Sequence, residues 1–486
     1  MKYAAALALL ALFALCAYRA AKQAITVDEA YVYQKYIQGK RPGEVFTIRY
    51  DSANHVLQTL LAYRAVHTFG RSELAIRLPS LIGAFFYFLG IWRLSFYAFR
   101  RQAFAALTIG LLALNPLLLD HMSLARGYGI ALALFTWSLY YGLRFFREHR
   151  TRDLLIAGVT LGLCVAANLT FAIPGVGLAL TVLLMLRRQN RPVRPAIRYC
   201  LAGILPAALL LAVPLSSVAR EQFYFGNQDL RGCIMDLCDI SLLYTGKAPI
   251  TPDDTVPYHT KIRAASFWLF PAMLGVIALL WLWSLRTRAP IGLLQFAAGS
   301  LVTAVLFLVL GHQFFHLLYP YDRTGLYLIF LFPLAVVAAI DLVWDWDVAI
   351  KAIAIPAALA MGLVVIAYGL ELHSGPFVEW PFADDVKGHL ATIRSHVSGK
   401  PVRLGGSSVF QYMVNFYRDA NRWTWLERMG QNPRQPGFDY YLLLLEDRPY
   451  VDRFHLRVLS ETPDSILAEP LTPSREGDKS AVLSAP

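Results

Sequence analysis

The chain consists largely of apolar runs that are each close to 20 residues long, or slightly shorter. A run of about 20 apolar residues crosses the hydrocarbon core of a bilayer as one helix. We predict eleven such spans, near residues 1–20, 75–96, 102–119, 128–146, 153–168, 172–186, 199–215, 265–285, 290–311, 324–344 and 352–370. The composition agrees, because 57% of the 486 residues are hydrophobic and only 16% are charged, against about 25% charged in soluble domains. The sequence therefore predicts an all-α polytopic membrane protein.

The basic residues lie in short clusters between the apolar runs. The strongest cluster is RRQNRPVRPAIR, residues 187–198, and others follow the second, fourth and eighth runs. Cytoplasmic loops carry such an excess of Lys and Arg. Eleven spans then place the N-terminus in the cytoplasm and the C-terminal tail outside it. The net charge of +12 is explained by these loops, so we expect membrane lipids and no nucleic acid as partners.

The first external loop, residues 21–74, contains two adjacent acids, Asp28 and Glu29, shortly after the first apolar run. Acids at a membrane edge are costly unless water, a cation or a function keeps them there. They can equally be the solvated first turn of a helix, where carboxylates suit the dipole. Residues 54–70 have an apolar face with internal charge, which is typical of a helix lying on the membrane. We expect two short interfacial helices in this loop.

The C-terminal region resembles a small soluble domain. The stretches PVRLGG and DYYLLLLED predict strands, and ADDVKGHLATIRSHV predicts a helix with apolar residues at 386, 390, 393 and 397. We therefore expect a membrane domain over 1–370, an extracytoplasmic α/β appendage over 371–472, and a disordered tail over 473–486.

No pattern in the sequence indicates a metal site or a cofactor. The spacing of cysteines and histidines matches no metal-binding motif, although the pair His312 and His316 leaves a divalent cation open. Cys233 and Cys238 share one loop that we place outside the cytoplasm. A disulfide between them is possible in an oxidising compartment, and the sequence leaves this open.

Four segments resemble the GT-C superfamily of polyprenyl-phosphate-dependent glycosyltransferases. They occur in the order in which that superfamily has them: VDEA after the first span, FGRSELAIRLPSLIGA at 69–84, SLARGYGIAL at 123–132, and YPYDRTGLYLIFLFP at 319–333. The resemblance is to protein O-mannosyltransferases (glycosyltransferase family 39) and to the aminoarabinose transferases that modify lipid A. The latter carry a Lys-Pro-Pro or His-Pro-Pro element where this chain reads Asp51-Ser52-Ala53-Asn54-His55, which leaves the sugar class open.

The resemblance implies an inverting transfer of a sugar from a polyprenyl monophosphate to a lipid, glycan or protein hydroxyl. The reaction would occur on the extracytoplasmic face. The large inserted domain of eukaryotic protein mannosyltransferases is missing, so we expect the inner (plasma) membrane of a bacterium. The sugar, the acceptor and the choice of undecaprenyl or dolichyl carrier are left open.

The resemblance also indicates the residues that carry the chemistry. A hydroxyl is a poor nucleophile, so a carboxylate must take its proton; we expect Asp28 to be this base, with Glu29 as its support. The leaving phosphate needs cations, and the planar fork of arginine suits it. For the donor phosphate and substrate we expect contacts from Arg126, Arg323, His55, Tyr128, Lys35 and Asp51.

Three other functions fit parts of the sequence. A transporter or flippase of lipid-linked sugars also explains many spans with charges at the membrane edge. A polysaccharide polymerase or ligase would use a diphosphate-linked donor. A structural subunit that binds a partner through its tail leaves the four ordered segments unexplained.

Overall fold

The computed structural model describes residues 1–486 except 219–225, 243–256, 288, 398–399, 431–433 and 472–486, and only the backbone of 257–264 and 266. The predicted disordered tail, residues 473–486, thus falls entirely outside the described residues. The chain forms two compact units. Unit 1 comprises Met1–Ala21, Lys40–Phe69 and Leu74–Ser374, and unit 2 comprises Lys22–Gly39, Gly70–Glu73 and Gly375–Pro486.

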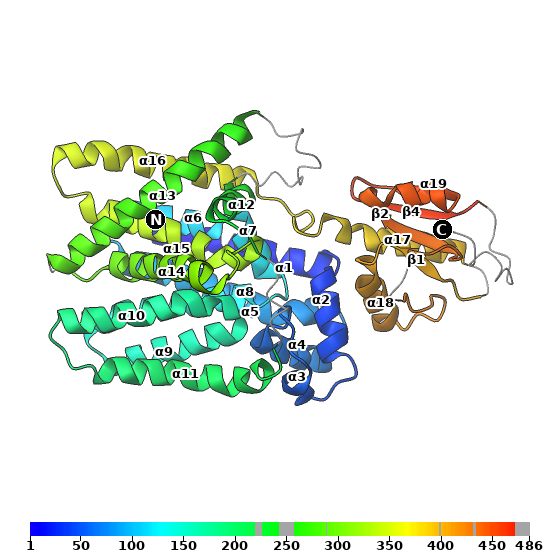
Figure 1. The fold of residues 1–486 in the computed structure, drawn as a ribbon, viewed down its shortest axis with the longest axis horizontal. Coiled ribbons are helices and arrows are strands. Elements are labelled where there is room, and N and C mark those ends of the chain that lie inside the picture. Colours follow the sequence, from blue (N-terminus) through cyan, green and yellow to red (C-terminus); the bar gives the residue numbers. More distant parts are fainter. Residues whose placement is uncertain (219–225, 243–256, 288, 398–399, 431–433, 472–486) are drawn as a thin grey trace. The chain divides into compact units, whose positions relative to one another are not determined.

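Unit 1 is entirely helical in its regular structure (Figure 1). Its helices are α1 (Lys2–Lys22), α3 (Glu44–Thr47), α4 (Val56–Phe69), α5 (Glu73–Ala98), α6 (Gln102–Ala113), α7 (Pro116–Ser123), α8 (Tyr128–Glu148), α9 (Thr151–Ala167), α10 (Ala172–Arg188), α11 (Arg194–Leu215), α12 (Leu230–Leu242), α13 (Pro257–Arg286), α14 (Leu293–Phe315), α15 (Leu326–Val343) and α16 (Val348–Leu370). This confirms the predicted class, a helical membrane protein with many spans.

Each predicted span coincides with a helix or with a broken pair of helices. Among the described residues, eight helices are long and apolar enough to cross a membrane, or nine if α6 and α7 form one bent span. These two helices are bent by 61°, because Asn115 caps α7 by accepting a hydrogen bond from the Leu118 N–H and Pro116 has no N–H to continue α6. The predicted number of eleven also counts α8 and α9, and it stays a prediction.

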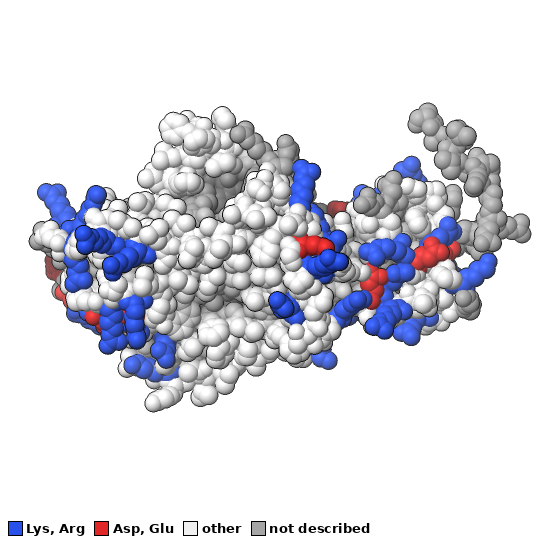
Figure 2. Space-filling view, turned by 90° about the horizontal axis from the view of Figure 1, so that it is seen from below, with Lys and Arg blue, Asp and Glu red and all other residues white. Residues whose placement is uncertain are grey.

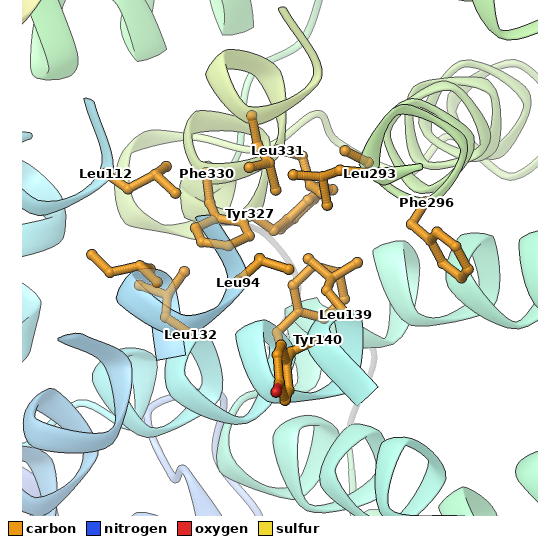
Figure 3. Packing of buried hydrophobic residues seen from close by; sticks show 14 of the residues in the cluster. Leu94, Leu112, Leu132, Leu139, Tyr140, Leu293, Phe296, Tyr327, Phe330 and Leu331 are labelled. Carbon is orange, nitrogen blue, oxygen red and sulfur yellow. The ribbon is translucent and has the colours of Figure 1, made fainter. Parts of the chain in front are cut away.

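The centre of unit 1 is built around α15. Tyr327, Phe330 and Leu331 of this helix are fully buried. Figure 3 shows them facing Leu94 of α5 and Leu132 of α8. Helices α8, α9 and α11 pack side by side, and α10 packs on α14. The helix α15 is therefore the buried centre, whereas α13 and α16 are mostly exposed, as expected of helices that face lipid.

The surface of unit 1 divides by charge. Figure 2 shows a broad area without charged side chains and a group of basic side chains at its left end, where Figure 1 places the connection between α10 and α11. An uncharged area next to a rim of basic side chains is typical of a protein that spans a bilayer. The assignment of this rim to the cytoplasm stays a prediction.

Unit 2 combines a four-stranded sheet with short helices. Its elements are α2 (Val27–Val32), α17 (Asp385–His396), β1 (Leu404–Gly406), α18 (Phe410–Ala420), β2 (Tyr440–Leu444), α19 (Pro449–Arg453), β3 (Leu456–Glu461) and β4 (Ser465–Pro470). The strand order is β1-β2-β4-β3, with β1 parallel to β2 and the other pairs antiparallel. Val386, Leu390 and Ile393 are buried on one face of α17. The predicted α/β character is confirmed, although α18, β3 and β4 were not predicted.

Part of the predicted first external loop, residues 21–74, belongs to unit 2. Residues 22–39 and 70–73 cluster with the C-terminal residues, and α2 packs on α18. Gln34 donates its side-chain amide to the Tyr412 carbonyl at 2.6 Å. Tyr33 contacts Phe416 edge to face at 5.1 Å between centroids. The predicted domain boundaries, which kept the whole loop with the membrane domain, stay untested.

The pairing of α9 with α11 generates a first prediction. Gly158 and Gly162 form a small-residue motif, and a Cβ at Gly162 would lie 2.0 Å from the Gly203 carbonyl oxygen. Small residues at this spacing let two backbones approach closely. We expect Gly162→Leu to lower the free energy of unfolding by about 1–3 kcal/mol or more, measured by thermal or denaturant unfolding in detergent. Gly362→Leu is the control, since nothing lies within 4 Å of a Cβ there; equal losses would contradict the prediction.

Candidate functional site

Three irregular connections of unit 1 bring polar side chains together. They are the loop 50–55 before α4, the connection 124–127 between α7 and α8, and the short 3-10 helix Asp322–Gly325 before α15. Five of the predicted site residues lie on or beside them: Asp51, His55, Arg126, Tyr128 and Arg323. Since each connection follows or precedes a helix of the membrane unit, the cluster lies at helix ends.

The loop before α4 is shaped by Asp51. Its carboxylate accepts a hydrogen bond from the Ala53 N–H at 2.9 Å, and its carbonyl accepts from the Asn54 N–H at 2.8 Å. The resulting turn presents the Ala53 carbonyl to Arg126, whose guanidinium donates to it at 3.3 Å. Asp51 thus has a structural role that we had not predicted, and its predicted contact with substrate stays untested.

Gly127 permits the close approach of the second connection to the first. Its φ is +73°, and a Cβ there would lie 2.3 Å from the Ala167 carbonyl oxygen and 2.8 Å from Cβ of His55. Only glycine adopts this conformation in this space without cost. The Arg126-Gly127-Tyr128 turn therefore places Arg126 and Tyr128 on either side of a residue that touches His55.

Tyr128 lies between two histidines. Its ring centroid is 5.3 Å from that of His55 and 4.8 Å from that of His121, both edge to face. The His121 Nδ1 is 3.0 Å from the Leu117 carbonyl. His121 was not among the predicted residues, although it lies only two residues before the stretch SLARGYG that follows the third predicted span.

Arginine charges from two of the connections act on His55. Burial lowers the pKa of His55 well below its usual 6.5, and the charges of Arg126, Arg323 and His121 lower it further. The Nε2 atom of His55 is buried and has no hydrogen-bond partner among the described residues. A neutral imidazole beside two arginines is an arrangement suited to an anion, because an added negative charge would relieve the repulsion.

The two adjacent acids belong to unit 2 and differ from each other. Glu29 is only 1% exposed and accepts hydrogen bonds from the N–H and hydroxyl of Thr26 at 3.0 and 3.1 Å. The Thr26 hydroxyl accepts from the Glu29 N–H, which completes a capping box at the start of α2. Asp28 is partly exposed. Asp28 is therefore the carboxylate of the pair that does not belong to the capping box.

The segment that carries Asp28 is fixed by α18. The Tyr417 hydroxyl accepts from the Ile25 N–H at 2.9 Å and donates to Glu73 at 2.9 Å. Glu73 also pairs with Lys387 at 2.7 Å. Tyr417 thus joins both pieces of the first external loop to the C-terminal helices. No pattern in the sequence indicated these contacts.

Lys35 also lies in unit 2, as do Asp28 and Glu29. It donates to the Tyr31 hydroxyl at 2.7 Å and lies over the rings of Tyr31 and Tyr36. Aromatic contacts of this kind stabilise an ammonium group. Its predicted contact with the donor stays untested. The structure thus gathers five predicted residues in unit 1 and three in unit 2.

The cysteine pair lies on α12 of unit 1. Cys233 and Cys238 are both buried and are not joined by a disulfide. Five positions on an α-helix correspond to a rise of about 7.5 Å and a rotation of about 140° from alignment, which separates the two thiols. The sequence left a disulfide between them open, and the structure does not form one.

Comparison with known proteins agrees with the resemblance. Residues 59–216 match the family model described as dolichyl-phosphate-mannose-protein mannosyltransferase. The resemblance to GT-C glycosyltransferases is confirmed. The matched third of the chain contains most of α4, all of α5–α11, and both Arg126 and Tyr128. A membrane glycosyltransferase is the class of protein that this match supports.

Solved structures show weaker similarity. ArnT from Cupriavidus metallidurans, bound to undecaprenyl phosphate, has 12% identity and a TM-score of 0.45, with 95% of this chain and 97% of that chain covered. The arabinofuranosyltransferase AftD from Mycobacteria has 13% identity and a TM-score of 0.45, with 98% and 40% covered. The Archaeoglobus fulgidus oligosaccharyltransferase has 12% identity and a TM-score of 0.38, with 84% and 63% covered. A comparison with curated protein sequences finds no match.

The environment of His55 generates a second prediction, on pH. The pKa of His55 in the folded chain lies below 6.5. Below pH 6.5 the histidine of the unfolded chain therefore binds a proton more readily than that of the folded chain. Stability is therefore full above pH 6.5 and falls as the pH decreases, by about 1 kcal/mol per pH unit. We expect His55→Gln to lose less stability than wild type between pH 7.5 and 5.5, measured by unfolding in detergent.

The control is His67→Gln, on the exposed end of α4. It should lose as much stability as wild type over the same pH interval. Identical losses in all three proteins would show that His55 does not titrate as the structure indicates.

Proposed function

We propose that this protein is an inverting glycosyltransferase of the membrane that moves a sugar from a polyprenyl monophosphate to an acceptor hydroxyl. The proposed reaction takes place on the extracytoplasmic face of a bacterial inner membrane. The family match over residues 59–216 supports the enzyme class. The cationic cluster around His55 supports the phosphate donor, and it is the observation on which the proposal depends most.

The donor phosphate is assigned to Arg126, Arg323 and His55. Arg126 is buried, at 4% exposure, so its charge is poorly hydrated and an anion would interact with it strongly. Arg323 acts on the same imidazole from the start of α15. The unsatisfied Nε2 of His55 offers one further hydrogen-bonding atom. A phosphate brings acceptor oxygens for all three groups.

Asp28 is the proposed base. In the transfer, the acceptor oxygen forms a bond to the anomeric carbon while the bond from that carbon to the phosphate oxygen breaks. The phosphate leaves with the electron pair, and Asp28 takes the hydroxyl proton. Glu29 is a poorer candidate than the sequence suggested, since its carboxylate already closes the capping box with Thr26. Its proposed role is to set the start of α2, and so the position of Asp28.

The arginines assist departure of the phosphate. Negative charge builds on the bridging oxygen as the bond to the sugar breaks, and fixed cations stabilise that charge without reorganisation. A neutral His55 can donate or accept one hydrogen bond there, depending on its tautomer. The acceptor is proposed only by class, as a lipid, glycan or protein that presents a hydroxyl.

The contrast between the two acids generates the third prediction. We expect Asp28→Asn to lower sugar transfer at least about 100-fold, the contribution of a general base, while polyprenyl-phosphate binding persists. Glu29→Gln should stay within a few-fold of wild type, because an amide oxygen still accepts from Thr26. The assay follows transfer or donor hydrolysis by purified protein in nanodiscs, over a small panel of polyprenyl-monophosphate sugars. Full activity of a correctly folded Asp28→Asn protein would remove Asp28 as the base.

The arginine assignment generates the fourth prediction. We expect Arg323→Gln to weaken binding of polyprenyl phosphate about tenfold or more, since a hydrogen bond between charged groups is lost. Arg64→Gln, an exposed arginine on α4, should bind as wild type. If both variants bind equally well, the phosphate is held elsewhere. If the donor binds, is never cleaved and crosses a liposome membrane, the protein is a transporter instead.

A further inference from the structure

A cavity of unit 1 lies among helix ends that do not contribute to the His55 cluster. It has a volume of about 690 Å³. Its walls come from the C-terminal ends of α5, α8, α13 and α15, from the N-terminal region of α14, and from the residues flanking α6 and α16. These are the ends that the charge pattern predicts to be cytoplasmic. A volume of this size accommodates a small-molecule or lipid headgroup.

The polar lining carries an excess of positive charge. Among the described residues it contains three arginines, Arg100, Arg101 and Arg147, against two aspartates, Asp341 and Asp345. Arg101 pairs with both aspartates, at 3.1 Å for Asp341. Arg101 and the two aspartates form a group of net charge −1, and Arg100 and Arg147 add +2, so the lining has a net charge of +1.

The two remaining arginines differ in how firmly they are placed. Arg147 donates to the carbonyls of Tyr97 and Ala98 at the end of α5, and its guanidinium lies 4.9 Å from the Tyr97 ring centroid. Arg100 is exposed and has no ion pair among the described residues. The cavity thus presents one fixed guanidinium and one that is available to an anion from outside.

The apolar lining continues to the lipid-facing surface. Trp283 of α13 lines the cavity, contacts Trp346 edge to face at 4.6 Å, and is still 40% exposed. Leu279 and Leu282, close to Trp283 on α13, are 67% and 53% exposed. Tryptophan is enriched at membrane interfaces because its ring is apolar and its N–H is polar. A ligand in this cavity can therefore extend an apolar chain along α13.

We infer that this cavity binds the phosphate headgroup of an anionic phospholipid, with the acyl chains along the exposed face of α13. Basic pockets between helices on the cytoplasmic side are the sites where such headgroups bind. A soluble phosphate compound shares the charge but would gain nothing from the tryptophans or from α13. The inference is independent of the proposed reaction, because it concerns helix ends that hold none of the proposed site residues.

The test follows thermal unfolding of the full chain in detergent during titration with three probes. These are phosphatidylglycerol, phosphatidylcholine and glycerol 3-phosphate. We expect phosphatidylglycerol alone to raise the unfolding temperature. Arg100→Gln should weaken its apparent affinity about fivefold, the contribution of one basic residue near a charged membrane. Arg93→Gln, an exposed arginine of α5 outside the cavity, should leave it unchanged.

A second variant fills the cavity. Gly292 lines it, and a Cβ there would meet only Gln295 Oε1, at 3.7 Å; with φ at −131°, any residue is tolerated. We expect Gly292→Phe to abolish the effect of phosphatidylglycerol, whereas Arg323→Gln should not change it. An equal effect of phosphatidylcholine, an equal effect of glycerol 3-phosphate, or equal losses in the Arg100 and Arg93 variants would each overturn the inference.

Discussion

Backbone amides within a bilayer must find hydrogen-bond partners in the chain itself, and this requirement determines where unit 1 can be irregular. Apart from the break between α6 and α7, its helices run through the buried centre around α15 without interruption, and the other irregular turns occur at helix ends. The turn at Gly127, the loop turned by Asp51 and the 3-10 helix before α15 are such places. The polar side chains of the candidate site are those that these three turns bring together.

The two ends of unit 1 use arginine in different ways. Arg101 pairs with two aspartates, and Arg147 is held by backbone carbonyls. At the other cluster, the charges that act on His55 are all cationic. The same residue type therefore binds aspartates and backbone carbonyls at one group of helix ends and acts on a buried histidine at the other. The His55 cluster combines a buried arginine, Arg126, with an imidazole nitrogen that has no hydrogen-bond partner among the described residues.

Much of this structure could be predicted from sequence because it depends on local patterns. Apolar length predicted the helices, and alternating or periodic apolar residues predicted β1, β2 and α17. Arg126 and Arg323 were predicted from segments at the edges of spans. The capping box of Thr26 and Glu29 also has a local pattern, a threonine three residues before a glutamate, which we did not use. By contrast, the bond from Ile25 to Tyr417 joins residues 392 positions apart, and no local pattern encodes it.

The central claim is that the cationic cluster of unit 1 holds a polyprenyl phosphate. A cryo-electron microscopy structure of the full chain in nanodiscs with added polyprenyl phosphate tests it most directly. The account predicts that the phosphate oxygens lie within hydrogen-bonding distance of the guanidinium groups of Arg126 and Arg323, and that the phosphate lies next to Nε2 of His55. A phosphate bound elsewhere, with this cluster unchanged and unoccupied at saturating lipid, would contradict it.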